Sequence, residues 1–524
     1  LIKFFKPKNV LPIVFGPALA NYMSKVLPAL GVQGVIPKTY QKWASGLRKN
    51  VLPELPNQYS ESTPMDVVEL KRHPLWLNYF KEEIKKRTEN FRNLFLQKLS
   101  NIEQIELVIR AWDALNNIPL IPRLINLVSW SKGEYFIESI ENLSSLRMRK
   151  LLQNILEKTF PELFESPHLL ISQIWNDCLV SKELLNSTVK RLAPGEFNDA
   201  QLNTAWSWAV RQYQNRQVNN DLLEIESVSL DQQKNILDNK IDNITNEKAL
   251  LDEEDDSLLL LLYQLAMGPL KRKNGKFLKY SHLMLDEAQD FGPLEFQLLV
   301  GLTNENFPSV TLAGDLDQRI MLGRKNDSWE QALSYLTLPN GKKPDITALE
   351  PLKIGYRSTS EIMNVAKNIM GEYSVNKDWY NSRDGTPVEF FKFREKGTMI
   401  AFLTEILEEL TIREPLASVA VLLRSQESAL SIYEGLQRSD LANLRFIKDQ
   451  EFSFTPGIDI TNIAQTKGLE FDTVIIADAD ASTYGPDIRS RQLLYVGVTR
   501  ASHQLWLLHC GNPSSLIKGI KEGL

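Results

Sequence analysis

The stretch His282-Leu-Met-Leu-Asp286-Glu287-Ala-Gln289-Asp290 decides the fold class of this chain. Its apolar run predicts a buried strand, and two adjacent carboxylates follow directly where that strand ends. At a strand end, one carboxylate can hold Mg²⁺ against nucleotide phosphates while the second orients or deprotonates the attacking water. Alone, the pattern is a weak indication, because ordinary strands also leave a core into polar loops.

Four further segments combine apolar runs with polar residues, in a fixed chain order. Arg357 precedes Glu361, Ile362 and Ala366 at helical spacing, and an arginine at a helix start can bind phosphate with two parallel hydrogen bonds. Taken singly, Arg357 and Arg500 could be surface or capping residues, and Lys467-Gly468 could be a turn. The segments are Val310-Thr-Leu-Ala-Gly314-Asp315-Leu-Asp317-Gln318, Ile354-Gly-Tyr-Arg357-Ser358, Ile460 to Asp472 with Lys467-Gly-Leu-Glu470-Phe-Asp472, and Leu494-Tyr-Val-Gly-Val-Thr499-Arg500-Ala501.

Together and in this order, the five segments resemble the motifs of the UvrD/Rep-like superfamily 1 helicase motors. The resemblance covers residues 281–510 well and residues 10–47 more weakly. It implies an α/β fold with two RecA-like P-loop NTPase domains and a long helical insertion in the first. ATP and Mg²⁺ are the implied cofactors. The implied roles are Mg²⁺ binding for Asp286, positioning of the attacking water for Glu287, γ-phosphate sensing for Gln318, phosphate contact for Arg357, nucleotide binding for Glu470 and the arginine finger for Arg500.

Residues 1–48 and 258–340 are expected to form the first RecA-like domain, and residues 341–524 the second. In motors of this kind the ATP site lies between the domains, so Asp286, Glu287 and Gln318 come from one wall and Arg357 and Arg500 from the other. Five strand candidates alternate with helical segments in the second domain and predict a mainly parallel sheet. These candidates are 388–393, 419–423, 445–447, 473–477 and 505–508.

Residues 49–257 show helical periodicity and are expected to form an insertion that projects from the motor. The acidic tract Asp252 to Asp256 is expected to be the solvated start of the next helix, since carboxylates favour the positive helix end. Before the insertion, the strand Val10 to Phe15 precedes a helix with an apolar face from Tyr22 to Leu30. The apolar positions Leu77, Phe80, Ile84, Phe91 and Leu94 form one stripe within the insertion.

A phosphate-binding loop, Gly-x-x-x-x-Gly-Lys-Ser/Thr, does not occur in this sequence. Gly275-Lys276 and Gly341-Lys342 lack both the upstream glycine spacing and the following hydroxyl. The segment from Val10 to Pro17 resembles the family element that follows the loop and its helix. We therefore expect a fragment that lies downstream of its P-loop and hydrolyses no ATP by itself.

Composition indicates a large protein with several cores, since 43% of its 524 residues are hydrophobic and 24% are charged. Two cysteines, Cys178 and Cys510, are too few for a disulfide framework or a zinc site and suit a reducing compartment. The longest apolar run, from Leu258 to Met267, is too short to span a bilayer and predicts a core helix. We expect a cytoplasmic monomer. The net charge of −5 argues against a broad basic field, although local basic grooves remain compatible with it.

Three departures separate the chain from DNA-unwinding relatives and make it similar to HelD, the RNA polymerase-associated member of the superfamily. The segment Gln318 to Arg324 lacks the stacking aromatics of those relatives, and Ala464 replaces a histidine. Arg357 and Lys467 lie only 110 positions apart, which leaves no room for a second large insertion. The resemblance implies that residues 49–257 grip RNA polymerase, that ATP-driven closure releases nucleic acid, and that contact with DNA or RNA is weak or transient.

Two alternatives remain open at this point. A DNA helicase or single-strand translocase of repair or recombination would need other aromatics, such as Trp329 or Trp379, to line its groove. A non-catalytic interaction module would keep the motor fold only as a scaffold.

Overall fold

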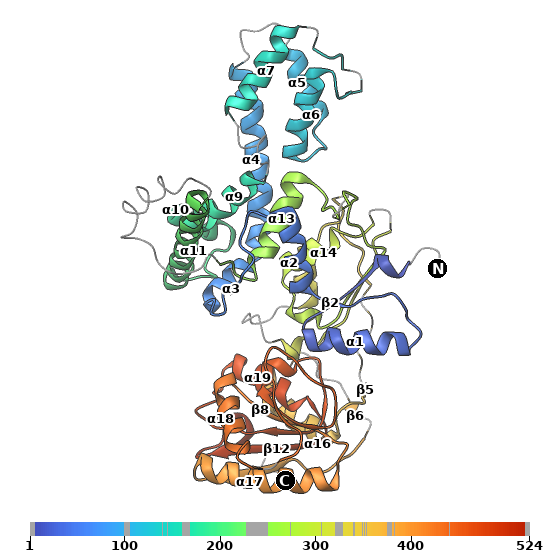
Figure 1. Cartoon of the computed structure of the whole chain (residues 1–524), viewed down its shortest axis with the longest axis vertical. Helices are drawn as coiled ribbons and strands as arrows, with labels where there is room; N and C mark the ends of the chain where they lie inside the picture. The colour runs from blue at the N-terminus through green and yellow to red at the C-terminus, as the bar shows by residue number, and fades with distance from the viewer. Residues whose placement is uncertain are drawn as a thin grey trace.

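The molecule has three parts along its long axis, shown by the computed structural model in Figure 1. The C-terminal domain lies at one end, a smaller sheet with its helices in the middle, and a helical projection at the other end. No helix among the described residues is long and apolar enough to cross a membrane. The described residues are 6–98, 105–138, 140–143, 145–159, 168–226, 250–272, 274–304, 307–319, 328–338, 341–347, 349, 352, 354–374, 380–381, 383–439 and 441–518.

Four short parallel strands form the first sheet, in the order β2-β1-β3-β4. They are β1 (Val10–Val14), β2 (Lys38–Thr39), β3 (His282–Leu285) and β4 (Val310–Leu312). β1 and β3 pair directly, although the whole helical insertion separates them in the sequence. Three helices pack together beside this sheet: α2 (Tyr40–Val51), α13 (Asp255–Met267) and α14 (Pro293–Val300). Leu258 to Leu262 of α13 are buried, which confirms the predicted core helix.

Helix α1 (Pro17–Ala29) buries a different face from the predicted one. Tyr22 is 46% exposed and Leu30, directly after the helix, is 72% exposed, so the expected apolar face is not a core face. Ala18 and Leu19 are the buried residues, and Ala18 belongs to a core cluster of the C-terminal domain. The spacing of the large residues Tyr22 to Leu30 could not show this, because the residues that are buried, Ala18 and Leu19, lie in the first turn of the helix.

The insertion is helical, and its far part projects from the middle of the molecule (Figure 1). In α4 (Leu75–Lys98) the side chains of Leu77, Phe80 and Phe91 are buried, which confirms these three positions of the predicted apolar stripe. The other two, Ile84 and Leu94, are half-buried. The other helices are α3 (Met65–Lys71), α5 (Ile105–Ala114), α6 (Leu120–Lys132), α7 (Leu146–Thr159), α9 (Leu169–Val180), α10 (Lys182–Leu192) and α11 (Asp199–Glu226).

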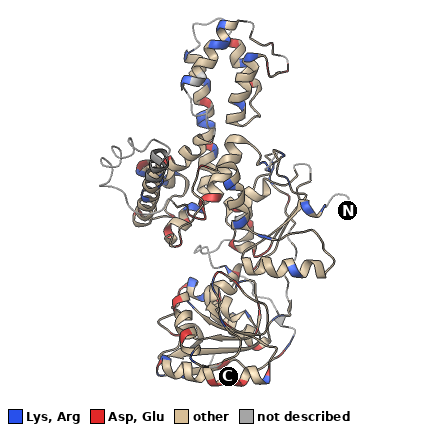
Figure 2. Cartoon of the chain, in the orientation of Figure 1, with Lys and Arg blue, Asp and Glu red and all other residues tan. Residues whose placement is uncertain are grey.

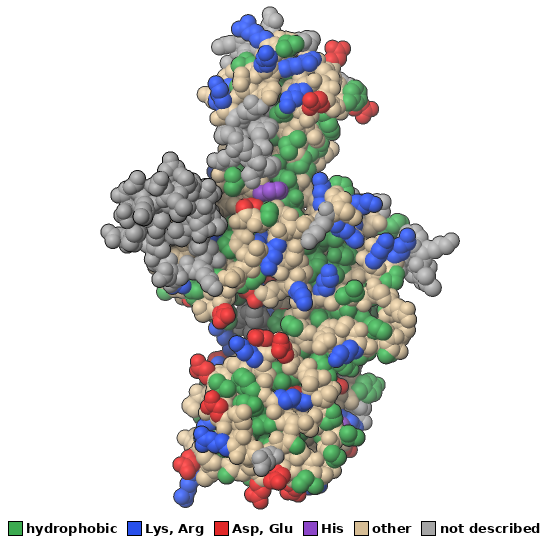
Figure 3. Space-filling model, viewed as in Figure 1, with side chains coloured by type: hydrophobic (Ala, Val, Ile, Leu, Met, Phe, Trp, Pro, Cys, Tyr) green, Lys and Arg blue, Asp and Glu red, His purple; other side chains and the backbone are tan. Residues whose placement is uncertain are grey.

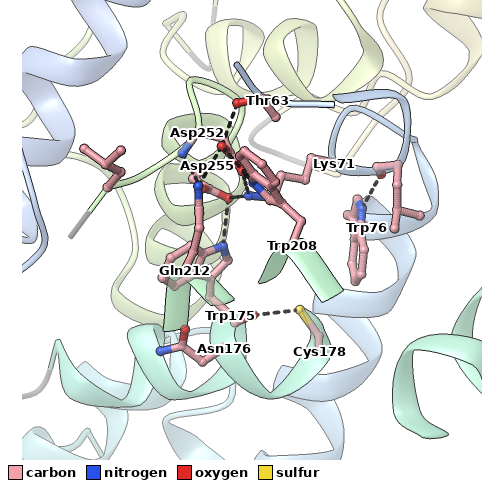
Figure 4. Close-up of polar contacts among 12 residues, drawn as sticks. Thr63, Lys71, Trp76, Trp175, Asn176, Cys178, Trp208, Gln212, Asp252 and Asp255 are labelled. Atoms are coloured by element: carbon pink, nitrogen blue, oxygen red, sulfur yellow. Dashed lines mark hydrogen bonds and ion pairs between the residues drawn. The ribbon is translucent and has the colours of Figure 1, made fainter. Parts of the chain in front are cut away.

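Asp252, Asp255 and Asp256 of the acidic tract at the start of α13 are buried, so the prediction of a solvated helix start is wrong for these three residues. In this tract Glu253 alone is exposed. Asp252 and Asp255 are fully buried, and Nζ of Lys71 lies 2.5 Å and 2.6 Å from their carboxylates. Figure 4 shows that Thr63, Trp208 and Gln212 also point toward Asp252. The charges come from α3 and from the start of α13, which are distant in sequence, so helical periodicity gave no sign of their pairing. This network fastens the insertion to the first domain.

Six parallel strands form the sheet of the C-terminal domain, in the order β7-β12-β11-β8-β10-β9. Apolar core clusters cover both faces, as expected for a parallel sheet. All five predicted strands are present, and the prediction of a parallel sheet is confirmed. The strands are β7 (Glu389–Phe393), β8 (Ser418–Leu423), β9 (Leu444–Phe446), β10 (Gly457–Asn462), β11 (Phe471–Ile476) and β12 (Ala501–Cys510).

In the described part of this domain five helices flank or follow the strands, and a separate two-stranded sheet precedes β7. The two-stranded sheet consists of β5 (Ile354–Gly355) and β6 (Tyr380–Asn381). The helices are α16 (Ser360–Met370), α17 (Lys396–Arg413), α18 (Gln426–Leu436), α19 (Ile488–Val498) and α20 (Ser515–Lys518). The architecture is mixed α/β with parallel sheets and is consistent with RecA-like helicase domains.

Candidate nucleotide site

Two carboxylates stand at the carboxyl end of β3, where the sequence predicted them. The Asp286 backbone N–H donates to the carbonyl of Ile13 in β1, and Oδ1 of Asp286 accepts from the N–H of Glu287 at 3.0 Å. Both side chains are half-buried. Burial and the charge of Glu287 raise the pKa of Asp286, while the positive charge of Arg357 lowers it. The pair therefore has negative charge that a cation would stabilise.

The backbone at Glu287 is left-handed, with φ of 52°. This conformation is uncommon for a residue other than glycine, and such residues concentrate at functional sites. Oε2 of Glu287 accepts from Nε2 of Gln289 at 2.5 Å, and Oε1 of Gln289 accepts from the N–H of Asp315 at 3.1 Å. A Cβ at Gly314 would meet Oε1 of Gln289 at 2.2 Å, so glycine is needed there. Gln289 thus joins the polar ends of β3 and β4.

Gln318 and Arg500 meet across the boundary between the two sheet domains. Gln318 ends the short 3₁₀ helix η4 (Leu316–Gln318) after β4, and Arg500 directly precedes β12. Nη2 of Arg500 donates to Oε1 of Gln318 at 2.6 Å. Two residues predicted to come from opposite walls of a cleft are therefore within hydrogen-bonding distance.

Arg500 is a fully buried cation held by neutral acceptors. Its Nε donates to the carbonyl of Val496 at 3.0 Å, and Nη1 donates to the carbonyl of Leu469 at 3.1 Å. Burial lowers its pKa to about 10, which leaves the group charged at neutral pH. Among the described residues no carboxylate lies within 4.0 Å of it, although the charge of Glu287 is near enough to favour the cation. A buried charge without an ionic partner is costly, so this position favours an incoming anion.

Arg357 and Glu470, predicted as separate nucleotide contacts, pair with one another. Nε of Arg357 lies 2.6 Å from Oε2 of Glu470, and the two side chains are 46% and 58% exposed. An exposed pair of this kind contributes little stability, so either partner can be released at small cost. The positive charge of Arg357 lowers the pKa of both Asp286 and Arg500, so Arg357 lies near these two predicted site residues.

The prediction missed the buried ion pair that joins the two domains. Nζ of Lys467 contacts Oδ2 of Asp290, and both side chains have 0% exposure. The same Nζ donates to the backbone carbonyl of Gln318 at 2.8 Å. Both residues lie inside motifs noted in the sequence, but Lys467-Gly468 also fits a turn. One signal in the sequence was available: Lys467 lies next to an apolar segment, and a lysine that is buried needs a carboxylate partner.

The donor set fits Mg²⁺ bound together with nucleotide phosphate. Within the described ranges, no group of three or more His, Cys, Asp or Glu residues is arranged to hold a metal ion. Mg²⁺ commonly uses one or two carboxylates, water and substrate phosphate, so Asp286 could supply the protein ligand. The half-buried Asp286 beside Glu287 matches that requirement.

Two adjoining segments of the chain match a known domain family. Residues 351–455 and 457–508 each match the UvrD-like helicase C-terminal domain. A candidate ATP-dependent DNA helicase of Acanthamoeba polyphaga mimivirus is 23% identical over 257 residues, which cover 44% of this chain and 35% of that protein. The aligned region therefore spans about a third of the length of that curated relative.

Two solved structures were also found to be similar. The C-terminal domain of a candidate DNA helicase from Lactobacillus plantarum is 25% identical with a TM-score of 0.27, covering 31% of this chain and 92% of that one. Arterivirus nonstructural protein 10, a helicase solved with DNA, is 15% identical with a TM-score of 0.23, covering 43% and 38%. The two family matches and the mimivirus protein support a UvrD/Rep-like helicase-type motor of superfamily 1.

Proposed function

We propose that this chain works as an ATP-driven superfamily 1 motor on nucleic acid, with ATP bound between its two sheet domains. The observation that carries the proposal is Arg500, a fully buried cation that donates to neutral acceptors and whose Nη2 contacts Gln318 of the other domain. A γ-phosphate in this place would supply the missing negative charge. Binding would thereby connect the two domains through the substrate.

The remaining residues have roles that follow from their positions. Asp286 would hold Mg²⁺, which supplies Lewis-acid stabilisation of phosphate charge. Glu287, one residue further and tied to Gln289, would orient or deprotonate the attacking water. Arg357 would exchange its exposed contact with Glu470 for phosphate. When phosphate leaves, the connection between the domains through the substrate would be broken, and the domains would be free to open.

An ATPase assay tests this assignment in two proteins. One is the 524-residue chain, which we expect to show no turnover above background because its sequence contains no Gly-x-x-x-x-Gly-Lys-Ser/Thr loop to hold the β- and γ-phosphates. The other, called here the loop-bearing protein, is the same chain joined at its amino end to a phosphate-binding loop segment. Turnover by the 524-residue chain itself would show that the cradle lies elsewhere.

In the loop-bearing protein, Glu287→Gln should bind a fluorescent ATP analogue like the unaltered protein and lose most phosphate release. An amide has nearly the same shape as the carboxylate but cannot act as a base, so nucleotide binding should be kept while hydrolysis is lost. Glu389→Gln, on an exposed position of β7, is the matched control and should leave both unchanged. Normal turnover by Glu287→Gln would remove the proposed role.

Action on RNA polymerase is the narrower form of the proposal, and the projecting arm favours it. Phe136 and Leu146, after α6 and at the start of α7, are 77% and 68% exposed, and Figure 2 shows Lys and Arg along the same arm. Exposed apolar residues on a surface that also carries charged side chains are typical of protein contacts. Core polymerase should co-purify with the chain and be lost with Phe136→Asp and Leu146→Asp, while Ile412→Asp, equally exposed on α17, should retain it.

The single-strand translocase is the competing form. Of the aromatics it would need, Trp329 is half-buried against the core of the first domain, and Trp379 lies outside the described residues, as do positions 320–327. Polymerase-independent unwinding of DNA by the loop-bearing protein would favour this form.

A further inference from the structure

A groove of about 490 Å³ lies at the open edge of the first sheet, away from the candidate nucleotide site. β2 pairs with Ile13 and Val14 of β1, and among the described residues no strand pairs with the first half of β1 on that side. Val10 and Leu11 line the groove there. The carboxylates Asp286 and Glu287 follow the opposite end of β3, because parallel strands share their direction.

The groove is lined by cations without matching anions. Lys8, Lys38, Lys42 and Arg272 contribute to its wall, and the described lining residues include no Asp or Glu. None of the four forms an ion pair within the described part of the chain. The three lysines are exposed and Arg272 is half-buried. Four cations facing one hollow surface repel one another unless an anion lies between them.

The two sequence segments that form the groove are also rich in Lys and Arg and contain no Asp or Glu. Residues 1–53 contain eight Lys and Arg and no Asp or Glu, and residues 257–285 contain five and none, in a chain whose net charge is −5. These two segments supply every residue that lines the groove. Figure 3 shows Lys and Arg gathered around apolar surface on the side of the middle part that carries the N-terminus. The basic surface is therefore wider than one small anion requires.

Exposed apolar side chains accompany these cations. Ile36 lines the groove and is largely exposed. Phe277 is also exposed, on the turn that carries Arg272, with Nζ of Lys271 5.8 Å from its ring centroid. Basic grooves with apolar or aromatic side chains suit single-stranded nucleic acid, because phosphates meet the cations and bases meet the apolar surface.

We infer that this groove is a binding site for single-stranded nucleic acid, with Lys8, Lys38 and Lys42 contacting successive backbone phosphates. The inference extends the proposed motor function by adding a contact outside the nucleotide cleft. It requires no sequence preference, since the cations meet phosphate and not base edges.

Fluorescence anisotropy with a labelled oligothymidylate, without nucleotide, tests the site in the 524-residue chain. The slope of log affinity against log salt changes by about 0.7 per phosphate contact of a single strand. The triple variant Lys8→Ala, Lys38→Ala, Lys42→Ala should therefore show a slope smaller by about 2 and bind about 100-fold more weakly near 0.1 M salt. Arg272→Ala alone should give a smaller change in the same direction.

The matched control replaces three exposed cations of the C-terminal domain, Lys367, Lys392 and Arg413, by alanine and should bind like the unaltered chain. Unchanged affinity and slope in the folded triple variant would overturn the inference. So would tighter binding of a polyglutamate peptide of equal charge, which would assign the groove to an acidic protein segment. Glu287→Gln should retain oligonucleotide binding, so failure of the motor proposal and failure of this site give different results.

Discussion

Replacing Lys467 by methionine should loosen the boundary between the domains by a measurable amount. Lys467 and Asp290 are both fully buried, so Lys467→Met leaves the Asp290 carboxylate without this cation and removes the donor to the Gln318 carbonyl. Breaking a buried ion pair by removing one partner costs about 3–5 kcal/mol. At about 1.36 kcal/mol per tenfold change, local opening should become about two to four powers of ten more frequent.

Hydrogen exchange followed by mass spectrometry measures that change in peptides covering residues 286–291 and 464–470. Strand β8 should exchange as before, because the C-terminal core is not touched. The double variant Lys467→Met, Asp290→Asn should recover part of the protection, since no unpaired charge stays buried. Lys367→Met on the exposed face of α16 is the control. Exchange in Lys467→Met indistinguishable from the unaltered chain would refute the reasoning.

Three further predictions concern single residues. Burial raises the pKa of Asp478 to about 6, so its contribution to stability is complete below pH about 4 and is lost as pH rises through 6. Asp478→Asn should remove up to about 3 kcal/mol of this pH dependence, measured as the free energy of denaturant unfolding at several pH values. The same pH dependence in Asp478→Asn and in the unaltered chain would contradict this. Lys71→Met leaves Asp252 and Asp255 buried together and should cost about 3–5 kcal/mol of stability, read as a lower melting temperature that exposed Lys85→Met does not reproduce. Gly468→Ala should cost about 1–2 kcal/mol, because φ is +79° and the new Cβ would lie 3.1 Å from Leu19, and an unchanged melting temperature would count against it.

Regular elements were predictable where one local pattern decided them. Strands of the C-terminal sheet are buried on both faces, so their apolar runs stand out, and α13 is recognisable by its length and composition. The prediction for the Asp252 tract failed because its partner Lys71 lies 181 positions away, and a local rule then favoured solvent. The prediction for the apolar face of α1 failed because its burial depends on another domain.

In the candidate site, too, residues within local motifs could be predicted, whereas contacts between distant segments could not. The order of the motifs in the sequence predicted Asp286, Glu287, Gln318 and Arg500 as site residues, and the fold brings the last two into contact. The contact between Lys467 and Asp290 depends on how two domains dock, across 177 positions of sequence, and no local pattern carries that information. The roles of these residues in catalysis remain predictions.

The most direct test of the central claim is ATP turnover by Arg500→Ala in the loop-bearing protein. If the phosphate lies between the two sheet domains, losing this buried guanidinium should reduce turnover by about 3 to 5 powers of ten while the analogue still binds. Arg500→Lys keeps the charge without the two-pronged geometry and should recover only part of the rate. Turnover by Arg500→Ala equal to that of the unaltered loop-bearing protein would contradict the account.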